Sequence, residues 1–368
     1  MKFGGYDKIL IFDVLLLVLF GLVMISSASV VMSYKEVGNQ YYYLAHQFFY
    51  GLVPGVILAC VFSRIDYRKF KKSAPLFLFA TLFLLLIVFV PGLGLDIRDT
   101  RSWITVAGMS FQPSELAKLT LIIYLAAWLE ERKKKLNDFS QGFVPFIMII
   151  VLVAIPLIKQ PDVGTLVAVC AIAGTMYFIA GAGITYILMM IAGGIVGVMT
   201  LIKIAPYRMN RLTTFLHPEL DPLGIGYQIN QSLLALGSGG LFGLGLGHSR
   251  QKFNYLPEPI GDSIFAVAGE ELGLLGLIFL IILFMVFATR GLAIARSAKD
   301  DFGKYIAVGI TAWVTFQAIL NIGAITSLLP LTGIPLPFVS YGGSALMSLL
   351  AGVGVLLSVS RYSNSYKK

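Results

Sequence analysis

Ten long apolar runs constrain the fold of this chain more than any other feature. A soluble core cannot hide that much apolar surface, because 57% of the 368 residues are hydrophobic, 13% are charged and the mean hydropathy is +0.84. The pattern predicts an all-α integral membrane protein with about ten transmembrane helices in one membrane domain, residues 1–368. The division of 143–204 stays open, because several runs are shorter than about 20 residues. The runs cover residues 9–31, 45–62, 75–91, 113–129, 143–158, 163–180, 184–204, 263–289, 303–328 and 341–359.

The basic residues indicate how the chain is oriented in the membrane. Seventeen Lys and Arg lie at the two termini and in the loops 63–74, 130–142 and 290–302, whereas eight lie in the longer loops between them. Cytoplasmic loops are rich in Lys and Arg, so both termini are predicted to be cytoplasmic. The segment 205–262 then becomes a large extracytoplasmic loop between the seventh and eighth helices. Orientation in the membrane also accounts for the net charge of +9, so we expect no nucleic-acid partner.

The stretch YLPEPIGDSIFAVAGEELGLLG carries three carboxylates into the apolar run that begins at 263. Two prolines precede Asp262, so a helix can begin only at about Gly261, and Asp262 is then near its N-cap. These residues leave two roles open for Asp262: capping of the helix and participation in a chemical reaction. Glu270 and Glu271 lie further inside the run, where a charge is costly, and they are expected to face protein or water and to orient helices or cations.

Other charged residues lie at the outer ends of the predicted helices. Glu115 and Lys118 share one helix face at i and i+3, and we expect them to line a lateral groove, with a structural ion pair as the alternative. Arg101 precedes them in an interfacial segment. Asp162 lies in the short KQPDVGT connection, where capping of a helix is its simplest role.

The predicted extracytoplasmic loop contains a glycine-rich segment, GSGGLFGLGLG. It lacks the strand and lysine of a nucleotide-binding loop, but its backbone N–H groups are suited to cradle a lipid phosphate. The loop also carries Arg208, Arg211 and Lys252. The three histidines and two cysteines have no metal-ligand spacing.

The chain contains six motifs in the order FQPSELAK, QPDVGT, DPLGIGYQINQS, GSGGLFGLGLG, LPEPIGDSIFAVAGEELG and GIPLPFVSYGGSAL. Together they resemble the motifs of the shape, elongation, division and sporulation family, whose members include RodA and FtsW. The resemblance covers nearly the whole chain, and the GDS and GIGYQINQS stretches are slightly closer to the FtsW branch. The chain departs from many relatives by having Ile260-Gly261-Asp262-Ser263 where they read His-Thr-Asp-Phe.

The resemblance implies a peptidoglycan glycosyltransferase of the bacterial cytoplasmic membrane that polymerises lipid II in division or elongation. It also implies partnership with a class B penicillin-binding protein and other divisome or elongasome membrane proteins, and a catalytic role for Asp262. We expect substrate contacts from the outward-facing polar residues of the motifs and loops. Whether a divalent cation assists is left open. These residues are Arg101, Glu115, Lys118, Asp162, Arg208, Arg211, Lys252, Ser340 and Gly342.

Two other functions fit the same charges. A transporter that moves the lipid-linked precursor without altering it also needs buried ionisable residues, although it would place them near the bilayer midplane. A pure scaffold for cell-wall proteins would not need an aspartate at the mouth of a membrane helix. Extension of lipid II into glycan strands separates the enzyme from both.

Overall fold

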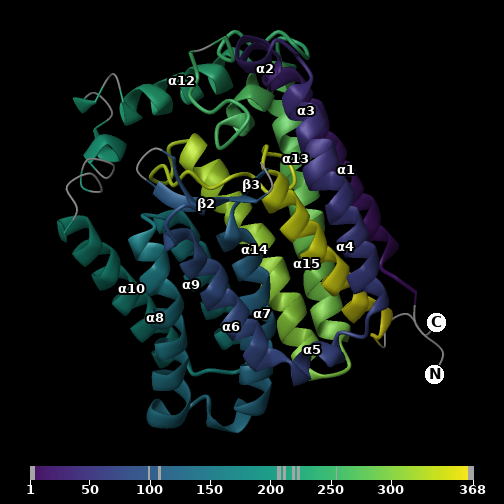
Figure 1. The fold of residues 1–368 in the computed structure, drawn as a ribbon, viewed down its shortest axis with the longest axis vertical. Coiled ribbons are helices and arrows are strands. Elements are labelled where there is room, and N and C mark those ends of the chain that lie inside the picture. Colours follow the sequence, from purple (N-terminus) through teal and green to yellow (C-terminus); the bar gives the residue numbers. More distant parts are fainter. Residues whose placement is uncertain are drawn as a thin grey trace.

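The computed structural model describes residues 5–97, 100–106, 109–204, 209, 213–217, 220–221, 224–253 and 255–363. Over these residues the protein is a mostly helical bundle, with one small sheet (Figure 1). The first half contains α1 (Lys8–Ala28), α2 (Val30–Val37), α3 (Tyr42–His46), η1 (Gln47–Leu52), α4 (Val53–Arg64), α5 (Arg68–Lys72), α6 (Ala74–Leu86), η2 (Ile87–Phe89), α7 (Pro113–Glu131) and η3 (Lys133–Lys135). The second half contains η4 (Phe139–Phe143), α8 (Val144–Lys159), α9 (Val163–Ile179), α10 (Ile184–Ile204), α12 (Ile225–Ser238), α13 (Ile264–Ser297), α14 (Asp301–Ile325) and α15 (Gly343–Arg361).

Every predicted apolar run overlaps a helix, but the helices differ in their ability to cross a membrane. Among the described residues, six helical segments are long and apolar enough to do so, and three more are apolar but shorter. The helix α7 belongs to neither group and carries buried charges. The structure therefore supports six to nine membrane helices. The long segments are Lys8–Ala28, Tyr42–Arg64, Phe139–Lys159, Ile264–Ser297, Asp301–Ile325 and Gly343–Arg361, and the shorter ones are Ala74–Phe89, Val163–Ile179 and Ile184–Thr200.

The centre of the bundle is formed by α7, α14 and α15. Of their residues, most are buried, including Trp313 of α14, the largest fully buried side chain. The outer helices instead expose large apolar side chains such as Phe12, Phe79 and Met148. A helix that is apolar on its outward face is stable only where lipid replaces water, so this distribution fits a membrane protein.

A three-stranded antiparallel sheet between α6 and α7 corrects the all-α prediction. Its strands are β1 (Gly94–Ile97), β2 (Thr100–Val106) and β3 (Met109–Phe111), in the order β1-β2-β3. In β2 the side chains of Ser102 and Ile104 are buried, whereas those of Arg101 and Thr105 are exposed. This alternation has the period of a half-buried strand, and it is the sequence signal that the helical prediction missed.

The basic loops predicted to share one side of the membrane meet at one end of the bundle. Arg68 Nε lies 2.7 Å from an Asp300 oxygen, and Lys133 Nζ lies 2.7 Å from an Asp301 oxygen. Lys71 Nζ lies 2.7 Å from Glu130, the first residue of the loop 130–142. The first and last described segments also meet at this end, because Asp7 N–H donates to Ser360 Oγ at 3.0 Å and Arg290 Nη2 lies 2.6 Å from Asp7 Oδ2. The prediction that these segments share one end is confirmed.

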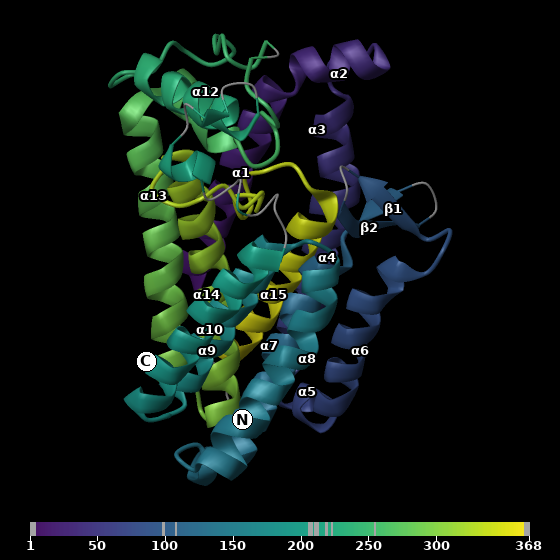
Figure 2. The ribbon, with the colours of Figure 1, turned by 90° about the vertical axis from the view of Figure 1, so that its left-hand side faces the viewer.

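At the opposite end, α12 lies across the bundle beside the start of α13 (Figures 1 and 2). The helix α13 is broken at Gly273, whose φ of 67° and ψ of −171° are not helical. A break leaves carbonyl and N–H groups without helical partners, and in a membrane protein these must be satisfied by other parts of the protein.

The glycine-rich segment 237–247 supplies hydrogen-bond partners for the backbone groups on both sides of the break. The N–H groups of Leu244 and Gly245 donate to the carbonyls of Glu270 and Glu271 at 2.9 and 3.0 Å. On the other side of the break, two N–H groups of α13 donate back to the segment: Leu274 to Gly240 at 2.9 Å and Leu275 to Leu241 at 3.2 Å. The expectation that this segment cradles a lipid phosphate is therefore wrong for the N–H groups of Leu244 and Gly245, because they donate to carbonyls of α13. We call this segment the wedge.

Candidate active site

Asp262 lies in a tight turn immediately before α13. The Glu258 carbonyl accepts hydrogen bonds from the N–H groups of Gly261 and Ser263, at 3.0 and 3.2 Å, and Glu258 has a φ of 50°. A positive φ is unfavourable for a residue with a side chain, so the turn persists because its surroundings hold it. The N-cap of α13 is Ser263, so the capping role considered for Asp262 is wrong by one position.

Three consecutive carbonyls of the turn are each held by another part of the protein. The Ile260 carbonyl accepts from Tyr341 N–H at 2.8 Å, and the Gly261 carbonyl accepts from Ser340 Oγ at 2.7 Å. The Asp262 carbonyl accepts from Asn321 Nδ2, also at 2.8 Å. Because the backbone is fixed on both sides of its Cα, Asp262 presents its side chain from a defined position. Asn321 lies one turn from the end of α14, so Asp262 is level with that end of the bundle.

The loop after α14 supplies most of these contacts. Its segment Leu336–Ser340 is buried. Ser340 Oγ also accepts from Leu336 N–H at 2.7 Å, and Gly342 N–H donates to Gln47 Oε1 at 2.9 Å. The two predicted substrate residues of this loop, Ser340 and Gly342, thus hold the Asp262 turn and the neighbouring η1. Contact with substrate stays a prediction for both.

The Asp262 carboxylate is only weakly compensated. Gln228 Nε2 from α12 lies 3.4 and 3.5 Å from its two oxygens, and Ser263 Oγ lies 3.4 Å from Oδ1. Among the described residues, no cation forms an ion pair with it. Burial, together with the nearby Glu258 carboxylate, raises the pKa of Asp262 to about 6. A carboxylate with this pKa is ionised at neutral pH and is a better base than an exposed aspartate.

Glu115 and Lys118 form a buried ion pair inside the bundle. Lys118 Nζ lies 2.7 Å from Glu115 Oε1 and 2.8 Å from Gln317 Oε1, and 5.2 Å from the centre of the Trp313 ring. The Lys118 and Glu115 residues are 2% and 1% exposed, so the prediction that they line a groove is wrong. Gln317 also donates to the Pro335 carbonyl at 3.1 Å, which connects the pair to the loop that holds Asp262.

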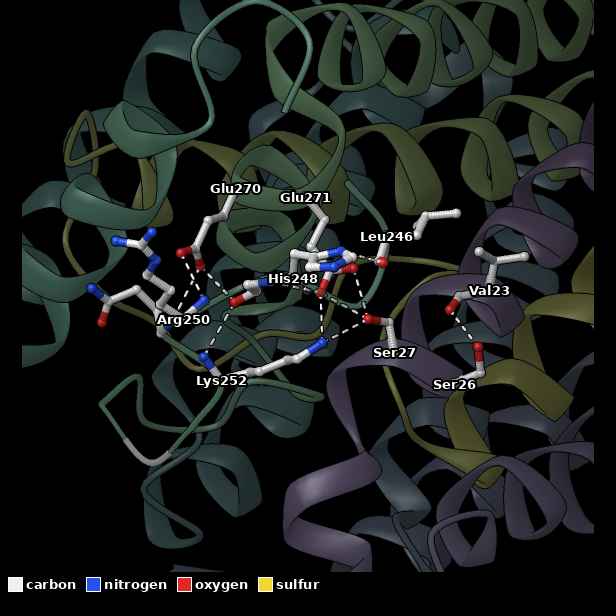
Figure 3. Close-up of polar contacts among 11 residues, drawn as sticks. Val23, Ser26, Ser27, Leu246, His248, Arg250, Lys252, Glu270 and Glu271 are labelled. Atoms are coloured by element: carbon white, nitrogen blue, oxygen red, sulfur yellow. Dashed lines mark hydrogen bonds and ion pairs between the residues drawn. The ribbon is translucent and has the colours of Figure 1, made fainter. Parts of the chain in front are cut away.

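A second buried cluster joins α1, the segment 249–252 that follows the wedge, and α13, as Figure 3 shows. Lys252 Nζ lies 2.8 Å from Glu271 Oε1 and donates to Ser27 Oγ at 3.0 Å. Glu270 accepts from Ser249 Oγ at 2.5 Å and from Arg250 N–H at 2.9 Å. Lys252, predicted as a substrate cation, is therefore already paired. Glu271 orients this cation, as expected, whereas Glu270 binds the loop residues Ser249 and Arg250.

The remaining predicted site residues are placed as follows. Asp162 is the N-cap of α9 and accepts from Thr165 N–H at 2.9 Å, which confirms its capping role. Arg101 is exposed on β2. Next to this sheet, Gln112 N–H donates to Ser344 Oγ of α15 at 3.2 Å. Arg208 and Arg211 lie outside the described residues. Within the described part of the chain, no three His, Cys, Asp or Glu side chains gather as metal ligands would.

The sequence reasoning missed the amides that organise the site. Gln317 and Asn321 lie within a predicted helix and Gln228 lies in the predicted extracytoplasmic loop, and each contacts Asp262 or the loop that holds it. Gln317 and Asn321 are spaced i and i+4 in the run 303–328, so they share one helix face. That pair of polar residues in an apolar run was the available signal.

Comparison with known proteins gives consistent matches over the whole chain. Residues 7–365 match the model of the FtsW, RodA and SpoVE family, described as "Cell cycle protein". Stage V sporulation protein E of Bacillus subtilis strain 168 is 43% identical over 97% of both chains, and a probable peptidoglycan glycosyltransferase FtsW of Geobacter sp. strain M18 is 44% identical over 97% of both. A chain from a peptidoglycan synthase complex described as coordinating polymerization and crosslinking aligns with a TM-score of 0.80 at 28% identity, over 98% of this chain and 99% of the other.

Proposed function

Because this chain belongs to the FtsW, RodA and SpoVE family of cell cycle proteins, we propose that it polymerises lipid II into glycan strands as a peptidoglycan glycosyltransferase. It is a multi-pass protein of the bacterial cytoplasmic membrane. The proposal includes ten crossings, cytoplasmic termini and an active site at the outer face, in a cell-division or elongation complex. The Lys and Arg asymmetry supports this orientation.

One observation carries the assignment: the backbone of Asp262 is held rigidly, while the residue is half-buried and its carboxylate is only weakly paired. In the proposed reaction this carboxylate removes the proton from the acceptor sugar hydroxyl. The hydroxyl oxygen bonds to the anomeric carbon of the donor from one face. The bond from that carbon to the lipid pyrophosphate breaks on the other face, so the transfer inverts the configuration.

The pyrophosphate leaves as an anion and needs positive charge more than it needs an acid. Arg101 is the exposed candidate among the described residues, and we propose Arg208 and Arg211 as further candidates. The charges of Lys118 and Lys252 are balanced by Glu115 and Glu271, so we assign them structural roles around the site. A class B penicillin-binding protein is the proposed partner, since the aligned synthase complex couples polymerization to crosslinking.

Replacement of Asp262 by asparagine tests the proposal. Asp262→Asn keeps the shape of the side chain and its hydrogen-bonding capacity but removes its basicity, so the purified protein should bind lipid II and make no polymer. Glycan length is measured by gel electrophoresis after incubation with lipid II, with thermal stability measured in parallel. Asp138→Asn is the matched control, because Asp138 is an exposed N-cap of η4 and asparagine caps equally well.

Two outcomes would overturn the proposal. Polymerisation by Asp262→Asn at the wild-type rate would show that another group acts as the base. If the wild-type protein makes no polymer but moves lipid II between the leaflets of a vesicle, the chain is a transporter and the Asp262 assignment fails with the enzyme.

A further inference from the structure

Gln228 is the only side chain from α12 that the structure brings to Asp262 within the described residues. Its Nε2 lies between the two carboxylate oxygens, at 3.4 and 3.5 Å, and 3.2 Å from Ser263 Oγ. The donor therefore bridges the side chain of Asp262 and the N-cap of α13. While the backbone contacts fix the Asp262 Cα, this amide restricts the rotation of its carboxylate.

We propose that Gln228 is a positioning residue that orients the Asp262 carboxylate towards the acceptor hydroxyl. The inference rests on the proposed glycosyltransferase function and deepens it. It makes α12 a part of the active site, although α12 belongs to a different segment of the chain from the turn that carries Asp262.

The position of α12 is fixed well enough for this role. A side chain at Gly239, just after α12, would meet the Gly269 carbonyl at 2.0 Å, and one at Gly269 would meet Leu236 at 2.5 Å. The two backbones therefore touch. Beyond α12, the wedge is bonded to both sides of the α13 break, and Lys252 is bonded to Glu271 (Figure 3). Two parts of the segment 237–252 are thus attached to α13, the helix that follows the Asp262 turn.

The charges around Asp262 predict how loss of Gln228 would change the pH dependence of the reaction. Glu258 is the described charged group that acts on Asp262, and it disfavours the ionised carboxylate, whereas the Gln228 and Ser263 hydrogen bonds favour it. Removing the Gln228 amide therefore raises the pKa of Asp262 further. The base must be ionised to accept a proton, so the acid side of the pH–rate profile should move to higher pH.

The experiment compares the pH dependence of polymerisation in three purified variants supplied with lipid II. The wild-type rate should fall as the pH drops through about 6. In Gln228→Ala the same fall should occur roughly one unit higher, the lower end of the range for one hydrogen bond to a charged group, because this hydrogen bond is long. In Gln228→Glu the shift should be larger, because a second carboxylate then lies beside Asp262. The rate should decrease with little change in the KM for lipid II. Asn230→Ala, which removes an exposed amide from the same helix, should match the wild type.

The outcomes separate this inference from the function on which it rests. An unchanged pH profile in both Gln228 variants would overturn the positioning role, even if Asp262→Asn is inactive. Equal loss at every pH, with lower thermal stability, would make Gln228 a structural residue only and would also overturn it. Absence of polymer from the wild-type protein would instead reject the proposed function.

Discussion

Four acidic side chains at or near the Asp262 end of the bundle are compensated in different ways. Glu115 and Glu271 each face a lysine, at 2.7 and 2.8 Å, and Glu270 accepts from a hydroxyl and from backbone N–H groups. Asp262 has only long hydrogen bonds, from an amide and a hydroxyl. A carboxylate that is already bonded to a cation gives up that interaction when it takes a proton, so Asp262 is the best base of the four.

The Glu115–Lys118 pair should be essential for stability. Lys118→Met leaves Glu115 buried without its cation, and breaking a buried pair in this way costs about 3 to 5 kcal/mol. We therefore expect a lower midpoint of thermal unfolding in detergent. The double variant Glu115→Leu with Lys118→Met should recover most of the loss.

Lys133→Met provides the control for that experiment, because its pair with Asp301 is exposed and such pairs contribute about 0 to 1 kcal/mol. If Lys118→Met unfolds at the wild-type temperature and also fails to bind lipid II, the pair serves the substrate and not the fold.

Residue spacing predicted some of these contacts and not others. The i and i+3 spacing of Glu115 and Lys118 gave a structural ion pair as the alternative to the groove, and the structure shows that pair. Their partner Gln317 is 199 positions away from Lys118, so only the packing of α14 against α7 brings it there. The catalytic assignment of Asp262 came from the motif resemblance, whereas its amide partners depend on long-range packing.

At the scale of elements, the wedge and the break in α13 depend on each other. A side chain at Gly243 would meet the Glu271 carbonyl at 2.2 Å, and one at Gly273 would meet the Gly243 nitrogen at 2.3 Å. Both glycines also have positive φ, at 79° and 67°. The backbones can approach this closely only because neither residue carries a Cβ.

Gly243→Ala should therefore separate the wedge from α13. The backbone strain alone is worth about 1 to 3 kcal/mol, and the displaced Glu271 carbonyl would lose its bond to Gly245 N–H. We expect lower thermal stability and weaker polymerisation, since α12 would shift away from Asp262.

The control is Gly237→Ala, where nothing lies within 4 Å of the added Cβ. Alanine in a helix should gain about 0.5 to 1 kcal/mol over glycine. Equal thermal stability of Gly243→Ala and Gly237→Ala would contradict the close packing of the wedge against α13.

The helices were predicted more accurately than the irregular elements. Apolar runs of helical length mark the helices directly, so the predicted and observed segments overlap along the chain. The break at Gly273 lies inside a continuous apolar run without proline, and nothing local marks it. The role of the wedge depends on that break. The small sheet was missed because its period-two pattern is only a few residues long.

At the scale of the whole molecule, the two ends of the bundle have different composition and different chemistry. One end holds the contact between Asp7 and Ser360 and the ion pairs among the basic loops. The other end holds α12, the wedge and the Asp262 turn (Figure 2). If lipid II is used outside the cell, the second end must be the extracytoplasmic one, as the Lys and Arg distribution also predicts.

Cysteine labelling in intact cells tests this orientation. Cys60 and Cys170 are both exposed, so they are first replaced by alanine, and single cysteines are then introduced by Asn230→Cys in α12 and Lys134→Cys in η3. Both positions are exposed. Helix α12 lies at the Asp262 end of the bundle, whereas η3 lies at the other end, where Lys133 pairs with Asp301. A membrane-impermeant maleimide should modify Asn230→Cys in intact cells and Lys134→Cys only after permeabilisation. The reverse result would place Asp262 on the cytoplasmic side, and polymerisation outside the membrane would then be impossible for this chain.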